Sequence, residues 1–379
     1  MDYADAIQRA LRRFEEWAGR APSSGEVRAA VVQVEELRTL AVEQRIMVVQ
    51  HRRKFQTLAV ADRLLWVAQD DAAEDPRLAL GWLDTLDALL DLDVFDRDDF
   101  EAFHVSGLTV RTQALRAVTF AKMGRHHDAE VVLQVARYMD SGDILAEAEL
   151  EESCGLVAAM RQRLEAAREH FGAARRVYES LQDTHLMARV DLRHSFACGE
   201  SRLYGEAIDL ALAGCADLDE RREPRLLLAG LFNLARYLKD AGRIDSAVAV
   251  VARARPIFSA IGRRTDHLRL VWFEAGLTAS QGHWREAVEL YRRALDGFAA
   301  LDQVFEVSAI AIEAADAFQS TGVADDAIRL LEVAVATMHS DGAQVDVIAA
   351  TIALRDAMAR RAATAALFAA ARAQIERLG

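Results

Sequence analysis

The sequence predicts an all-α fold, a right-handed superhelical solenoid of antiparallel helix hairpins. Three observations carry this prediction. The chain of 379 residues holds only 4 prolines, and its many Ala, Leu, Arg and Glu residues favour helix throughout. A small–large–small pattern of side chains marks one helix face at positions i, i+4 and i+7. The same pattern then recurs at a nearly constant interval, which is typical of a repeat architecture.

The repeated pattern is clearest in the stretch GHWREAVELYRRALDGFAALDQ, residues 282–303. Ala287, Tyr291 and Ala294 lie on one stripe of the predicted helix. From the first stripe onwards, successive leading alanines are separated by 38, 40, 40, 40 and 40 residues, so each interval is one structural unit. The other leading alanines are Ala129, Ala167, Ala207, Ala247 and Ala327.

A second helix is predicted before each of these stripes. A small residue stands 12 positions before every leading alanine, and in four units a glycine stands 5 positions before it. The glycine suits a tight turn, and the small residues let two helices approach closely. A hairpin of this kind cannot bury its apolar face alone, so the units must stack. The small residues are Ala117, Gly155, Ser195, Ala235, Ala275 and Ala315, and the glycines are Gly124, Gly242, Gly282 and Gly322.

These offsets resemble the tetratricopeptide repeat (TPR). The matching features are the small residue of the first helix, the turn glycine and the A-x3-large-x2-A pattern of the second helix, over residues 109–350. The family's usual unit has about 34 residues, so this chain resembles a longer variety. It lacks the family's proline after the second helix and its tryptophan in the first. The chain is similar to bacterial regulatory TPR proteins, without the DNA-binding module that often precedes their repeats.

The two ends of the chain depart from the repeat pattern. We expect an N-terminal helical region over residues 1–70, with a helix over 2–17, a capping box from Ser23 to Glu26 and then one long helical pattern. The repeat solenoid is predicted over residues 71–350, with a degenerate second helix around Ala79. Residues 351–379 are predicted to form a last hairpin and C-terminal capping helices.

Composition excludes several functional classes. The formal net charge of −13 argues against a nucleic-acid partner, because phosphate binding needs a basic surface. No apolar run is long enough to span a membrane, for which about 18 residues are needed. The 3 cysteines show no C-x-x-C spacing, so we predict neither disulfides nor a zinc site, and a reducing bacterial cytoplasm fits this composition best. No cofactor is expected.

The sequence shows no catalytic motif. Neighbouring His126 and His127 point in different directions on a helix and are interpreted as surface turn residues. The acidic run DLDVFDRDDFEAFH lacks the glycine of a calcium loop and is interpreted as a solvated connection. The basic run HRRK, residues 51–54, is expected on the exposed face of the long helix. The cysteines lie at or near packing positions. We therefore predict no catalytic residue and no metal ligand.

The first helices supply the candidate binding residues. In TPR-like solenoids these helices line the concave surface, and here the middle repeats place basic, aromatic and amide side chains at inward positions, between acidic ends. Arginine pairs with carboxylates and aromatic rings anchor apolar groups, so we predict a partner with acidic and apolar side chains. The alternative is that these residues only join neighbouring repeats. The predicted partner-binding residues are Arg189, Arg193, Phe196, Asn233, Arg236, Lys239, Arg269 and Trp272.

A non-catalytic scaffold or regulator that binds a protein or peptide is the function this sequence favours. One hypothesis places it in a regulatory assembly, such as a sigma-factor circuit or a protease-linked defence system. A second makes it a peptide-sensing, transcription-related regulator. An enzyme with an unrecognised site and a structural oligomer-former are the remaining alternatives. The sequence does not identify the partner or the oligomeric state.

The substitution Ala287→Leu tests the repeat assignment. Ala287 is placed where two helices touch, so the larger side chain should lower the free energy of unfolding by about 1–3 kcal/mol through overpacking. The damage should stay near the adjoining repeats, since contacts in a solenoid are local. Thermal melting followed by circular dichroism measures the effect. An unchanged melting curve would contradict the assigned register.

Overall fold

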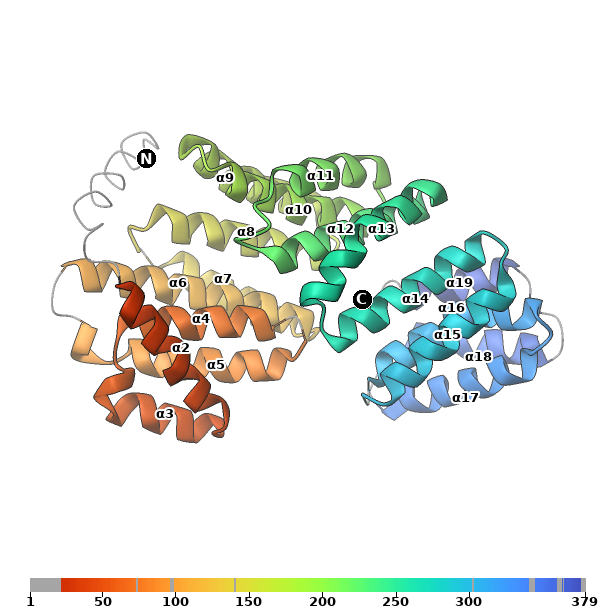
Figure 1. Cartoon of the computed structure of the whole chain (residues 1–379), viewed down its shortest axis with the longest axis horizontal. Coiled ribbons are helices and arrows are strands. Elements are labelled where there is room, and N and C mark those ends of the chain that lie inside the picture. The colour runs from red at the N-terminus through yellow and green to blue at the C-terminus, as the bar shows by residue number, and fades with distance from the viewer. Residues whose placement is uncertain are drawn as a thin grey trace. The chain divides into compact units, whose positions relative to one another are not determined.

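The computed structural model is helical in every part that it describes. The predicted helix over residues 2–17 lies outside the described residues. Within those residues the chain forms eighteen α-helices, two short 3-10 helices and no strand (Figure 1). The described residues are 22–72, 74–95, 99–139, 141–301, 303–340, 345–359, 363 and 365–375.

Four helices precede the regular repeats. The predicted capping box is confirmed, because the Glu26 amide donates to Ser23 Oγ at 3.3 Å and the Ser23 amide donates to Glu26 Oε2 at 2.8 Å. Ala79, predicted as the small packing residue of a degenerate second helix, is fully buried in the last of these helices. The helices are α2 (Ser24–Arg38), α3 (Val42–His51), α4 (Leu58–Asp71) and α5 (Pro76–Leu90).

The prediction of one long helix in this region is wrong. The pattern is broken between α2 and α3, where the buried Arg45 side chain donates from Nε to the carbonyl oxygens of Leu37 (3.1 Å) and Leu40 (2.9 Å). These carbonyls end a helix, so the arginine satisfies groups that a continuous helix would have paired internally. The basic run 51–54 is exposed as predicted, but it ends α3 and enters the 3-10 helix Arg53–Phe55.

The remainder of the described chain consists of helix hairpins, as predicted. Each pairs an even-numbered first helix with an odd-numbered second helix. The first helix α6 begins at Asp99, so part of the acidic run expected to be a connection is helical. The pairs are α6 (Asp99–Lys122) with α7 (His126–Arg137), α8 (Ile144–Met160) with α9 (Leu164–Ser180), α10 (Thr184–Glu200) with α11 (Tyr204–Asp217), α12 (Pro224–Asp240) with α13 (Ile244–Ile261), α14 (Arg264–Ser280) with α15 (Trp284–Ala299), α16 (Val304–Ser320) with α17 (Ala324–Ser340), and α18 (Val345–Ala359) with α19 (Ala365–Ile375).

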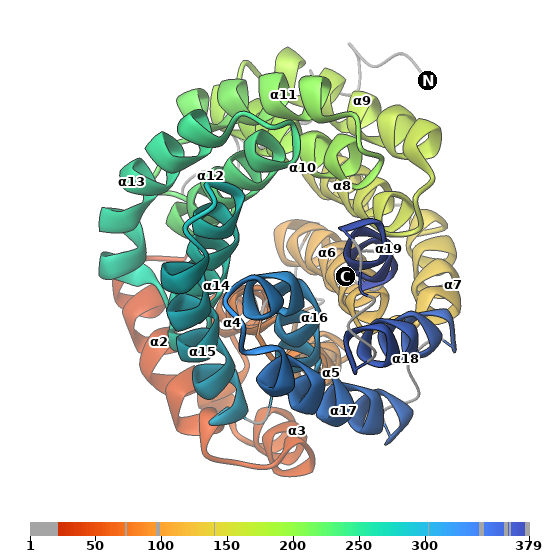
Figure 2. The same cartoon turned by 90° about the vertical axis from the view of Figure 1, so that its right-hand side faces the viewer.

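The chain divides into two compact units, Met1–Asn233 and Leu234–Gly379, with the boundary inside α12. In the first unit, α8 and α10 lie on the inner side of a curve and α9 and α11 on its outer side (Figure 2). First helices contact one another directly, α6 with α8 and α8 with α10. The domain boundaries drawn at residues 70 and 350 rest on the repeat pattern and stay predictions. Among the described helices, none is both long and apolar enough to cross a membrane.

Small residues make the contact inside each hairpin. All six leading alanines of the second helices are fully buried, and so are their small counterparts on the first helices. A Cβ atom added to Gly155 would lie 2.6 Å from the ring of Phe171, which is the large residue of the facing stripe. The large side chain therefore fills the space that the small residue leaves, as the sequence pattern predicted.

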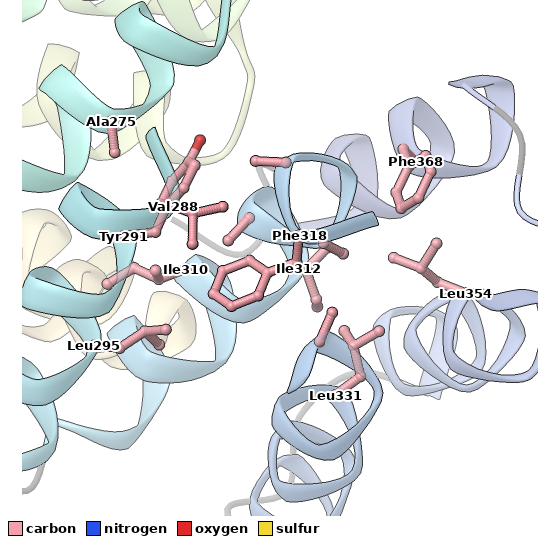
Figure 3. Packing of buried hydrophobic residues seen from close by; sticks show 14 of the residues in the cluster. Ala275, Val288, Tyr291, Leu295, Ile310, Ile312, Phe318, Leu331, Leu354 and Phe368 are labelled. Carbon is pink, nitrogen blue, oxygen red and sulfur yellow. The ribbon is translucent and has the colours of Figure 1, made fainter. Parts of the chain in front are cut away.

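The second unit contains a buried apolar cluster to which several hairpins contribute. Tyr291, Phe318, Leu331 and Phe368 come from four helices and share one buried cluster (Figure 3). Phe368 of α19 is buried in it, and α19 contacts both α16 and α18. Helix α19 thus shares the buried apolar core of the preceding hairpin.

The turn inside most hairpins is left-handed at one residue. The four predicted turn glycines have φ angles between 72° and 82°. Two hairpins form the same turn without glycine, at Gln162 (φ 56°) and Arg202 (φ 60°), which stand at the equivalent position. A residue with a Cβ atom pays a conformational cost there that glycine does not.

Exchanging residues at this turn should change stability in opposite directions. Gly282→Ala should lower the free energy of unfolding by about 1 kcal/mol, because φ is 80° and an L-residue is disfavoured there. Arg202→Gly should raise it by up to about 1 kcal/mol. Gly205→Ala in α11 is the control, since its φ is not positive and alanine favours helix. Chemical denaturation measures all three, and equal losses for the two alanine variants would contradict the turn argument.

Candidate functional site

All eight residues predicted to bind a partner lie on first helices. Arg189, Arg193 and Phe196 lie on α10, while Asn233 ends the first compact unit within α12. The four others belong to the second unit: Arg236, Lys239, Arg269 and Trp272.

In the first unit, the predicted arginines converge on one buried carboxylate. Glu152 of α8 is completely buried and accepts a hydrogen bond from Arg189 Nη2 at 2.6 Å and another from the Tyr178 hydroxyl at 2.5 Å. Arg193 donates to its other oxygen. Three successive helices, α8, α9 and α10, therefore meet in one hydrogen-bonded group. We call Glu152, Tyr178, Arg189 and Arg193 the Glu152 cluster.

The Glu152 cluster extends along the first helices through further ion pairs. Arg189 also lies 3.7 Å from Glu149 of α8 and 3.4 Å from Glu223. Arg111 of α6 pairs with the same Glu149 at 2.9 Å and with Asp143 at 2.8 Å. Each arginine in this chain of contacts already faces at least one carboxylate. The positive charge predicted for this part of the concave surface is therefore neutralised by carboxylates of the protein itself. This agrees with the alternative that these arginines join neighbouring repeats.

Burial and charge act in opposite directions on the Glu152 cluster. Burial by itself would raise the pKa of Glu152, but Arg189, Arg193 and the Tyr178 hydrogen bond together lower it. Burial and the neighbouring carboxylate raise the pKa of Tyr178, so its hydroxyl stays protonated and remains a donor. The pKa of Arg189 is held well above its usual value by Glu152, against its own desolvation. The cluster is thus charged and paired at neutral pH.

The second unit holds a smaller group around Glu313 of α16. Its carboxylate accepts a hydrogen bond from Trp272 Nε1 at 2.6 Å and lies 3.6 Å from Lys239 Nζ. The Tyr291 hydroxyl donates to it at 3.4 Å. The Trp272 ring also meets Phe298 edge-on, with 6.3 Å between centroids. Trp272 is therefore fixed on two sides and half-buried, with part of its ring still accessible.

The remaining predicted residues have looser surroundings. Arg269 lies 3.3 Å from Glu306 and keeps 40% of its side chain exposed, which leaves room for a second carboxylate. Arg236 lies over the ring of Tyr237, 5.1 Å from its centroid. Phe196 packs beside a buried apolar cluster of the first unit, and Asn233 is half-buried.

The sequence analysis missed the role of the carboxylates at the centre of each group. Glu152 and Glu313 were assigned to acidic ends of the groove, whereas each binds residues from a neighbouring repeat. The signal was present in the spacing: Glu152 is 37 residues before Arg189 and 41 before Arg193, and Trp272 is 41 before Glu313. Opposite charges one repeat apart indicate contact between stacked hairpins.

A half-open hollow of about 290 Å³ lies beside α2 and α3. Its acidic lining residue, Glu36, already pairs with Lys54 at 2.5 Å. Titratable groups do not converge in this lining as they do in an acid–base active site. The lining residues are Glu36, Leu37, Leu40, Gln44, Val48, Arg52 and Phe55.

Removing the central carboxylate should be costly. Glu152→Gln is expected to lower the free energy of unfolding by about 3–5 kcal/mol, because it leaves two arginines in a buried group without their anion. Glu165→Gln is the control: its side chain is 82% exposed beside Arg168, so a change below about 1 kcal/mol is expected. Chemical denaturation at neutral pH compares the two. Equal effects would show that the Glu152 cluster contributes nothing specific.

The same cluster sets a pH dependence. The pKa of Glu152 is lower in the folded protein than in the unfolded chain, so its stabilisation is present above the ordinary carboxyl pKa of 4.5 and is lost as pH falls through the lowered value. The stability difference between wild type and Glu152→Gln should therefore shrink below that pH.

No protein-family model and no curated protein sequence matches the chain. Solved structures do share its fold. A Rap protein complexed with Competence and Sporulation Factor is 12% identical, with a TM-score of 0.52, over 85% of this chain and 99% of that one. Aspartyl phosphate phosphatase F from Bacillus subtilis is 11% identical, with a TM-score of 0.52, over 88% and 94%.

A third structure is the Rap conjugation gene regulator of the plasmid pLS20 in complex with the Phr* peptide. It is 13% identical, with a TM-score of 0.50, over 84% of this chain and 85% of that one. At such identities the likeness shows the fold alone. It confirms the predicted TPR-like helical repeat architecture, and it extends over most of each chain compared.

Proposed function

We propose that this protein is a non-catalytic regulator that binds a peptide, or a peptide-like segment of a protein, along its first helices. The observation that carries the proposal is the shared fold. Over 84% of its length the chain matches a structure that is named as a conjugation gene regulator in complex with a peptide. This supports the peptide-sensing hypothesis over the scaffold in a defence system.

The side chains on the first helices of the second unit suit such a ligand. Trp272 offers part of an aromatic ring held in place by Glu313, and such preorganised rings are common binding anchors. Arg269 is only partly engaged by Glu306, so an acidic side chain of the ligand can share its guanidinium. We propose Arg236, Lys239, Arg269 and Trp272 as the binding residues of this unit.

The first unit is proposed to contribute differently. Arg189 and Arg193 are engaged by the buried Glu152, so their first role is to fix α10 against α8. A ligand carboxylate reaching them would have to compete with a complete set of hydrogen bonds. Phe196 and Asn233 are not held in this way and remain proposed contact residues of the first unit.

The phosphatase named among the similar structures does not extend the proposal to catalysis. Fold likeness at 11% identity carries over no catalytic residue. Binding needs only a surface of fixed shape and charge, which stacked hairpins provide. The regulatory circuit in which the ligand acts is not part of the proposal.

Binding can be tested with a ligand selected for the purpose. The full chain is used to select linear peptides from a random displayed library, and the affinity of the tightest one is measured by calorimetry. Arg236→Glu is expected to weaken it by about 1–3 kcal/mol, because a charge-assisted contact is replaced by repulsion. Arg293→Glu, an exposed arginine of the second helix α15, is the matched control and should leave affinity unchanged.

Salt and melting data complete this test. Affinity should fall as salt rises, since exposed ion pairs are screened. If Arg236→Glu lowers the melting temperature and Arg293→Glu does not, the arginine joins repeats rather than binding ligand. Normal affinity in a folded Arg236→Glu protein would place the ligand on another face. Failure to select any peptide would contradict the proposed function itself.

A further inference from the structure

Three potential metal ligands meet at the turn between α10 and α11. His194 and Cys198 lie one helical turn apart on α10, and Glu206 lies in the first turn of α11. Their nitrogen, sulfur and oxygen ligand atoms all lie within 4.8 Å of one another. Residues at i and i+4 share one helix face, so the hairpin brings the carboxylate to the histidine and the thiol together.

The histidine has an unused ligand atom. His194 Nε2 is buried and has no hydrogen-bond partner. Burial lowers the pKa of His194, which keeps its ring neutral and its lone pair available at neutral pH. Its ring rests 5.8 Å from that of Phe171, which holds its orientation. A buried polar atom without a partner is costly, and a metal ion would satisfy it.

The two neighbouring repeats use these two positions for packing. Forty residues later the equivalent residues are Leu234 and Leu238, both buried and apolar. Forty residues earlier they are Cys154 and Ala158, only one of which can bind a metal. The histidine–cysteine pair therefore differs from the two neighbouring hairpins, where these positions are apolar or hold a single cysteine.

We propose that His194, Cys198 and Glu206 form a binding site for a divalent transition-metal ion of the zinc type. Nitrogen, thiolate and carboxylate are the ligands that zinc takes in proteins, at about 2.0–2.3 Å. Ligand atoms around such an ion stand roughly 3.3–3.8 Å apart, so a small closure of side chains completes the site. Three protein ligands leave the fourth position to water. The site is independent of the proposed peptide binding.

In this structure, an arginine supplies the positive charge beside Cys198 and Glu206. Arg168 of α9 pairs with Glu206 at 2.5 Å, and it also donates a hydrogen bond to Cys198. About a third of its side chain is exposed, so it can turn into solvent when a metal ion takes its place. The guanidinium and the ion therefore compete for the same carboxylate and sulfur.

Metal binding must also remove a proton. Burial, followed by the nearby Glu206, raises the pKa of Cys198 to about 11, so the thiol is protonated at neutral pH. The ion binds the thiolate, and the thiol proton passes to the solvent.

Cobalt is the probe for this site, because a thiolate bound to Co²⁺ gives a charge-transfer absorption that free Co²⁺ lacks. The full chain, freed of metal with a chelator, is titrated with Co²⁺ and then with Zn²⁺. We expect the absorption to appear with Co²⁺ and to disappear as Zn²⁺ displaces it. No absorption at millimolar Co²⁺ would overturn the proposal.

Variants locate the ligands. Cys198→Ala should abolish the absorption, and Glu206→Gln should weaken Co²⁺ binding about tenfold or more. Cys154→Ala is the matched control, since Cys154 is also buried and burial raises its pKa to about 11 as well. The Co²⁺ absorption of the Cys154→Ala variant should equal that of wild type. Arg168→Gln should bind several-fold more tightly because the competing cation is gone. Absorption that survives in Cys198→Ala, or tighter binding in Glu206→Gln, would overturn the site.

Discussion

The close contact between the two helices of each hairpin is the constraint on which the rest of the structure depends. A Cβ atom on Gly155 would collide with Phe171, and one on Gly214 would lie 2.7 Å from Leu192. Such contacts fix how the two helices of a hairpin lie against each other, because a bulky side chain fits only where its neighbour is small. Once this register is fixed, side chains one repeat apart meet. The pairing of Glu152 with Arg189 is a consequence of the packing rather than its cause.

The ion pairs on the first helices add specificity more than stability. Burying a carboxylate costs a large desolvation energy, which its partners only offset. Removing one partner of the buried ion pair therefore lowers the free energy of unfolding strongly, while the intact pair adds little to it. The Glu152 cluster joins α8, α9 and α10 through one carboxylate. A ligand that binds along first helices needs a surface of this kind, whose shape is set before the ligand arrives.

Much of this fold could be predicted from patterns of residues that are close in sequence. The wrong predictions concern features that depend on contacts between residues farther apart. We could predict the packing faces of the helices that begin near Ala167 and Ala287, and also the turn at Gly282. Both features depend on neighbouring residues, through the helix period and the left-handed φ. The turn at Arg202 carries no glycine signal. At the break after α2, Arg45 reaches back to the carbonyl of Leu37 at the end of α2 and to that of Leu40 in the connection, within a sequence that has helical period throughout. For the candidate site, the first helices that carry the eight residues could be predicted, and the binding role of these residues stays a prediction. The partners of Arg189 and Trp272 were missed, because their spacing of about one repeat becomes a contact only when the hairpins stack.

The most direct test of the account is where a bound peptide lies. Hydrogen exchange of the full chain, with and without a peptide selected for binding, reports protection helix by helix. The account predicts slower exchange on first helices, above all α14 and α16 around Trp272 and Arg269, and no change on the second helices α15 and α17. Protection confined to second helices, or spread evenly over both, would contradict binding along the first helices.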